Sequence, residues 1–107
     1  MTEEMIYIND PLGRKICFPK KLCALEIKEI DMLDLYDDIY TVVAKPAILI
    51  ETLNFPVEYF YFRSLGWHFS VLIKVKYIHH CWEAYTCIIN PSDTDIVEIL
   101  KRGKQLI

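Results

Sequence analysis

Residues 57–89, VEYFYFRSLGWHFSVLIKVKYIHHCWEAYTCII, are dense in the β-branched and aromatic residues that favour strands. Polar breaks interrupt this stretch at 64–66 and at 78–81. Short apolar runs bounded by turn residues are typical of consecutive antiparallel strands. The stretch therefore predicts a three-stranded meander, with strands over 57–63, 67–77 and 82–89.

The segments on either side predict helices and edge strands laid against this meander. An Asn-Asp-Pro-Leu-Gly turn at 9–13 favours an N-terminal hairpin, with strands over 5–8 and 15–18. Residues 20–30 fit a helix or a strand, and their Lys, Leu, Ala and Glu favour a helix. Further helices are predicted over 33–44, 47–53 and 93–101, and an edge strand over 105–107. We therefore predict an α+β fold: a mostly antiparallel sheet of four or five strands, with two or three helices packed on one face.

Length and composition restrict the class of protein. The chain has 107 residues, which predicts a single domain over 1–107. No apolar run approaches the roughly 18 residues that a membrane-spanning helix needs, and the acidic N-terminus has no signal-peptide core. We therefore expect a cytoplasmic protein with no membrane partner. The net charge of −3 means that any nucleic-acid site must be a local basic patch.

The cysteines and histidines could suggest a metal site, but their spacing argues against one. The four cysteines form two C-x5-C pairs, 17/23 and 81/87, which is not the spacing of a structural zinc site. Buried thiols are the favoured interpretation, with metal ligation as the alternative. His79 and His80 are adjacent and would point to opposite faces of a strand. No complete nucleotide-binding or hydrolase motif occurs, so the sequence predicts no metal and no cofactor.

Alternation within the meander predicts one surface that carries both aromatic and cationic side chains. An apolar face should turn toward the helices, and consists of Phe60, Phe62, Val71, Ile73 and Val75. The opposite face should show Tyr59, Tyr61, Arg63, Lys74, Lys76 and Thr86. Such a surface suits single-stranded RNA, because rings stack on bases while cations hold phosphates. The alternative is a solvated face on which lysine stems cover tyrosine rings.

His68 follows Arg63 across the first predicted turn. A histidine beside an arginine can act as general acid or base on a phosphodiester while the arginine stabilises the charge. The alternative interpretation is an ordinary exposed turn histidine.

The order of several segments resembles the toxin-type nucleases of the barnase–EndoU–colicin–RelE superfamily. The matching segments are GRKICFP (13–19), DIYTVVAKP (38–46), IETL (50–53), VEYFYFR (57–63), VLIKV (71–75) and AYT (84–86). In that family a helix ending before P-x-x-I leads into strands with YYR, VVVKV and TAY. The resemblance implies a metal-independent ribonuclease, with Arg63, Lys74 and Thr86 near the phosphate. Residues 22–31 lack the histidine that the family carries in its first helix, which favours weak or absent cleavage.

Two functions follow from these observations. The first is a diverged toxin-like nuclease-fold domain that binds RNA. The second is a small protein-interaction module of the immunity or regulatory type, favoured by the acidic balance and the many aromatic residues. A homodimer formed through an edge strand is compatible with either function.

Overall fold

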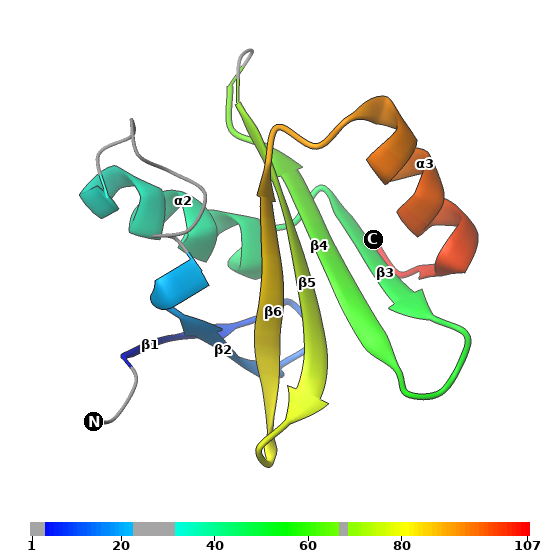
Figure 1. The fold of residues 1–107 in the computed structure, drawn as a ribbon, viewed down its shortest axis with the longest axis horizontal. Coiled ribbons are helices and arrows are strands. Elements are labelled where there is room, and N and C mark those ends of the chain that lie inside the picture. The colour runs from blue at the N-terminus through cyan, green and yellow to red at the C-terminus, as the bar shows by residue number, and fades with distance from the viewer. Residues whose placement is uncertain (1–3, 23–31, 67–68) are drawn as a thin grey trace.

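The computed structural model describes residues 4–22, 32–66 and 69–107, in which seven strands form one mixed sheet (Figure 1). The strand order is β1-β2-β6-β5-β4-β3-β7. The strands are β1 (Met5–Asn9), β2 (Lys15–Pro19), β3 (Ile48–Thr52), β4 (Glu58–Ser64), β5 (Ser70–Ile78), β6 (Cys81–Ile89) and β7 (Gly103–Gln105). The helices in the described part are α2 (Met32–Ala44) and α3 (Asp93–Arg102).

The predicted fold class is α+β in general but wrong in its particulars. The sheet has seven strands rather than four or five, and it is mixed because β2 pairs with β6 in parallel. The predicted helix over 47–53 is strand β3, and the last strand lies at Gly103–Gln105 rather than at 105–107. The N-terminal hairpin, the meander and the helices near 33–44 and 93–101 are present. The helix predicted over 20–30 falls mostly on 23–31, outside the described residues.

The helices cover both faces of the sheet rather than one. The α2-side core contains Ile39, Val42 and Val43 of the helix, packed with Tyr61 and Ile73 of the sheet. On the other face a smaller α3-side core consists of Ile50, Phe60, Leu72 and Ile99, all at most 1% exposed. The central strands are therefore buried on both sides, which explains why their apolar residues run almost continuously. In the described part, no helix is long and apolar enough to cross a membrane.

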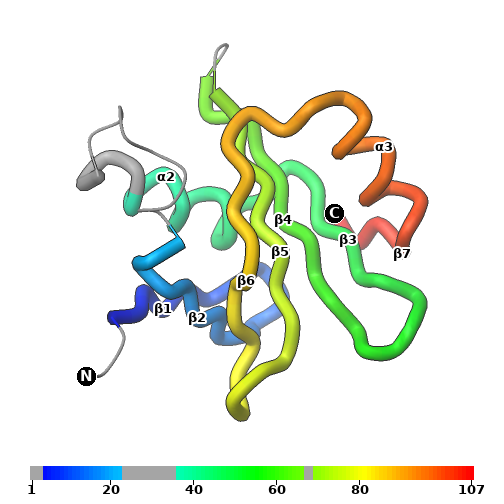
Figure 2. Tube along the Cα trace, in the orientation of Figure 1, coloured from blue at the N-terminus to red at the C-terminus, as the bar shows by residue number. Residues whose placement is uncertain are grey.

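The N-terminal hairpin crosses the sheet on the α2 side (Figure 2). Ile8, Ile16 and Phe18 of this hairpin are at most 1% exposed and belong to the α2-side core. Only Ile16 and Cys17 of β2 pair with β6. The hairpin is consequently held by side-chain contacts across the face as much as by the strand ladder.

At the opposite edge, β7 packs on β3 through Gly103. A methyl group added at Gly103 would lie 2.1 Å from the carbonyl oxygen of Glu51. This close approach is between two backbones, so no side-chain rotation relieves it. Glycine is required here because any side chain would clash with β3. Its backbone conformation is not the reason, since a φ of −163° is ordinary extended backbone.

We expect Gly103→Ala to lower the free energy of unfolding by about 1–3 kcal/mol, because the β3–β7 pair must separate to admit the methyl group. Urea unfolding measures the loss, and hydrogen exchange should show lower protection at β7. Lys104→Ala on the same strand is the control, since its exposed side chain should cost less than about 0.5 kcal/mol. Equal effects of the two substitutions would contradict the steric explanation.

Candidate functional site

The α3 side of the meander carries cations laid over aromatic rings. Phe60 is paired with Lys74, which is paired in turn with Thr86, so the three residues share this face. The Lys74 Nζ lies 5.4 Å from the centre of the Phe60 ring, and the Arg102 guanidinium carbon lies 5.0 Å from it. The Lys76 Nζ lies 4.6 Å from the centre of the Tyr85 ring. These separations are within the range of cation–π attraction. We call Lys74, Lys76, Lys101 and Arg102 the basic patch.

Glu58 is the carboxylate at the centre of this patch. It accepts a hydrogen bond from the Tyr85 hydroxyl and lies opposite Lys76 across the β4–β5 pair. Its second oxygen is 3.5 Å from an Arg102 nitrogen. Burial, followed by the bond to Glu58, raises the pKa of Tyr85 well above the usual range for tyrosine. Glu83 lies opposite Lys76 on the other side, across the β5–β6 pair. The cluster therefore holds a neutral phenol, two carboxylates and the four cations of the basic patch, which leaves a net positive charge.

A pocket of about 400 Å³ opens beside the basic patch, between the β3–β4 loop and the end of α3. The lining residues are Thr52, Leu53, Asn54, Phe55, Pro56, Glu58, Lys101 and Arg102. This volume lies within the usual range for small-molecule sites. Phe55 is 93% exposed and Leu53 is 75% exposed, so the loop presents two apolar side chains to solvent. The Thr52 hydroxyl holds the base of the loop by accepting a 2.8 Å hydrogen bond from the Glu58 amide.

The predicted surface is divided between the two faces of the sheet. Lys74, Lys76 and Thr86 lie on the α3 side, whereas Tyr59 and Tyr61 are buried on the α2 side. The assignment of both tyrosines to the lysine face is therefore wrong. Strand alternation was correct, but the pairing register places Phe60 opposite Lys74 and Tyr61 opposite Ile73.

Two of the predicted catalytic residues, Arg63 and Thr86, are not brought together. Arg63 pairs with Val71 on the α2 side, and its Nη1 donates a 2.7 Å hydrogen bond to the Lys45 carbonyl oxygen. Thr86 is on the opposite face. His68 lies outside the described residues, so its proximity to Arg63 stays a prediction. Within the residues that are described, no cluster of three or more His, Cys, Asp or Glu side chains could hold a metal ion.

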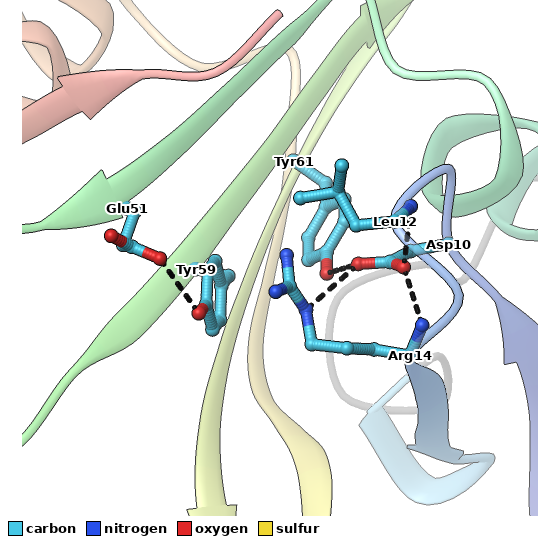
Figure 3. Close-up of polar contacts among 6 residues, drawn as sticks. All are labelled: Asp10, Leu12, Arg14, Glu51, Tyr59 and Tyr61. Atoms are coloured by element: carbon cyan, nitrogen blue, oxygen red, sulfur yellow. Dashed lines mark hydrogen bonds and ion pairs between the residues drawn. The ribbon is translucent and has the colours of Figure 1, made fainter.

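Tyr59 and Tyr61 instead belong to a buried polar network with the β1–β2 turn (Figure 3). The Asp10 side chain is 0% exposed, and its carboxylate accepts hydrogen bonds from the Leu12 and Arg14 amides and from the Arg14 Nε. The Tyr61 hydroxyl donates to the same carboxylate at 2.7 Å. Burial and this bond raise the pKa of Tyr61 far above its usual range.

The Arg14 guanidinium completes this Asp10 network. Its central carbon lies 3.7 Å from the centre of the Tyr59 ring, while the Tyr59 hydroxyl donates to Glu51 at 2.8 Å. The Arg14 Nη2 is buried and finds no hydrogen-bond acceptor among the described residues. The network joins the hairpin turn to β4, so we assign the two tyrosines a structural role.

Sequence reasoning missed Phe55, Glu58, Tyr85, Lys101 and Arg102 as site residues. Lys101 and Arg102 form the basic last turn of α3, a position that does not by itself mark a binding site. Tyr85 joins the basic patch because a bulge shifts the register between Lys74 and Val75, and no sequence signal marks it. Phe55 could have been found from the sequence. It is a large apolar residue between the turn residues Asn54 and Pro56, and no strand pattern explains its presence there.

Comparisons with protein-family models, curated proteins and solved structures give no significant match to this chain. The resemblance to toxin-type nucleases therefore stays a prediction. A functional proposal for this protein has to rest on the geometry of its own surface.

Proposed function

We propose that the basic patch and the adjoining loop pocket bind single-stranded RNA. The observation that carries this proposal is the grouping of Lys74, Lys76 and Arg102 beside a pocket that exposes Phe55. Cations suit the phosphates, and a ring that is 93% exposed suits an unpaired base. Binding without cleavage is proposed, because Arg63 and Thr86 lie on opposite faces of the sheet. In the cytoplasm, the location that the sequence predicts, the protein would encounter single-stranded RNA.

The cationic part of the proposal is tested with Lys74→Gln/Lys76→Gln and a labelled oligouridine over a range of KCl concentrations. We expect affinity to fall about 10-fold, and the slope of log K against log[KCl] to become shallower by about 1.4, or 0.7 per lost phosphate contact. The matched control is Lys15→Gln/Lys20→Gln, which removes the same charge from two lysines that also lie over tyrosine rings. The proposed site would be refuted if both double variants lost the same affinity for oligouridine. It would also be refuted if the affinity of the wild type did not depend on KCl concentration.

The aromatic part is tested separately with Phe55→Ala. Loss of one stacked base should weaken oligouridine binding about 5- to 150-fold. Leu53→Ala is the control, because it removes an exposed apolar side chain from the same loop without removing a ring. Single-stranded DNA of matched sequence, used as a competitor, shows whether the 2′-hydroxyl contributes.

A protein partner is the second candidate function, and the exposure of Leu53 and Phe55 together favours it. Large exposed apolar side chains are typical of protein contact sites. A second copy of the same chain is one such partner. Analytical ultracentrifugation of the wild type and of Leu53→Ser/Phe55→Ser is the test. A wild-type protein that stays monomeric at high concentration would count against the homodimer.

A further inference from the structure

Two thiols from distant parts of the sequence lie on neighbouring strands where β2 joins β6. In this parallel pair Ile16 lies opposite Trp82, and Cys17 lies opposite Glu83. Ile16 and Trp82 pack in the α2-side core. Because side chains alternate along a strand, Cys17, Cys81 and Glu83 share the other face. By this register Cys81 lies diagonally across from Cys17, two positions before Glu83 on β6. The Cys81 thiol is near enough to raise the pKa of the Cys17 thiol.

We propose that Cys17 and Cys81 form a redox-active dithiol, which small organic disulfides such as oxidised glutathione convert to an intramolecular disulfide. The Cys81 thiolate attacks one sulfur of oxidised glutathione, which forms a mixed disulfide and releases one glutathione. Cys17 loses its proton to solvent and attacks the Cys81 sulfur, which releases the second glutathione. The two thiols lose two electrons and two protons, and one oxidised glutathione becomes two reduced ones.

The surroundings of the two thiols set this order of attack. Cys17 is 5% exposed, whereas Cys81 is half-buried beside the β5–β6 turn and is the thiol that an oxidant can reach. Burial, followed by the neighbouring Cys81 thiol, raises the pKa of the Cys17 thiol to about 11. Among the charged neighbours, Lys15 lowers this pKa and Glu83 raises it. Cys17 therefore suits the role of the resolving thiol rather than the attacking one.

The disulfide would close the chain between positions 17 and 81 and join β2 covalently to β6. The strand ladder at this place consists of two residue pairs, Ile16↔Trp82 and Cys17↔Glu83. A cross-link over so long a loop restricts the unfolded chain strongly. We expect oxidation to raise the midpoint of thermal unfolding by about 10 °C.

The test uses dilute Cys23→Ser/Cys87→Ser protein, in which Cys17 and Cys81 are the remaining thiols. After incubation with oxidised glutathione, intact mass should fall by about 2 Da and both thiols should disappear. Thermal unfolding should shift upward and return on reduction. Stable glutathione adducts, disulfide-linked dimers or unreacted thiols would each overturn the proposal.

Two further measurements ensure that every result either supports or refutes the Cys17–Cys81 disulfide. Cys17→Ser in the same background should retain glutathione on Cys81 and show no thermal shift, because the resolving thiol is gone. If the double variant does not fold, peptide mapping of the oxidised wild-type protein replaces it. A peptide linking Cys17 to Cys81 supports the proposal, and any other cysteine pairing refutes it.

Discussion

Asp10→Ala is expected to lower the free energy of unfolding by about 3–5 kcal/mol. The Asp10 carboxylate is 0% exposed and accepts hydrogen bonds from the Arg14 side chain and the Tyr61 hydroxyl. Removing it leaves a partly buried guanidinium without its counter-ion and a buried phenol without its acceptor. A typical domain has only about 5–15 kcal/mol of stability, so this single change should remove a large share of it.

Urea unfolding of Asp10→Ala, Arg14→Met and the double variant measures the coupling directly. Because the double variant removes both charges, its cost should be clearly smaller than the sum of the two single costs. Asp37→Ala is the control. Removing that exposed carboxylate from α2 should change the free energy of unfolding by less than about 0.5 kcal/mol. Additive single effects would show that Asp10 and Arg14 act independently.

Phe60→Ala is expected to lower the free energy of unfolding by about 3–5 kcal/mol. Phe60 is 0% exposed in the α3-side core, where Ile50, Leu72 and Ile99 are the other buried members among the described residues. Half-buried apolar side chains surround these four, and strand or helix backbone holds each of them in place, so the cavity left by the ring should fill only in part. The ring also supports Lys74 and Arg102, so its loss should disorder the basic patch as well.

Hydrogen exchange distinguishes this effect from a general loss of stability. Protection should fall first in α3, because Ile96 and Ile99 attach the helix to Phe60 and its neighbours. Phe60→Leu is the matched control: it keeps most of the apolar volume and should cost about 1–1.5 kcal/mol. If α2 loses protection as early as α3, the two cores do not behave as separate units.

The sequence predicted elements better than it predicted how they combine. Turn residues and alternation located the hairpin, the meander and two helices. The segment Ile48–Thr52 was misinterpreted because Leu49 and Ile50 are buried on opposite faces, and a strand that is apolar on both sides has no alternating pattern. The parallel contact between β2 and β6 leaves no local signal either, since it joins residues far apart in the chain.

The candidate site shows the same limit in more detail. Lys74 and Lys76 were correctly placed on one strand face, but Tyr59 and Tyr61 were added to that face although the register excludes them. Register depends on the geometry of the turn between two strands, and alternation alone does not fix it. The burial of Tyr61 depends further on Asp10, which reaches it from the N-terminal hairpin.

The link between Asp10 and Tyr61 spans 51 positions, which has a consequence for how the protein is made. The first hairpin leaves the ribosome well before β4 has been synthesised. Until then the Asp10 carboxylate is hydrated, because its partner Tyr61 has not yet been translated. Contacts between such distant positions are formed late and slow the folding reaction. We therefore expect nascent chains that end before β4 to leave the hairpin undocked, and its docking to follow translation of the meander.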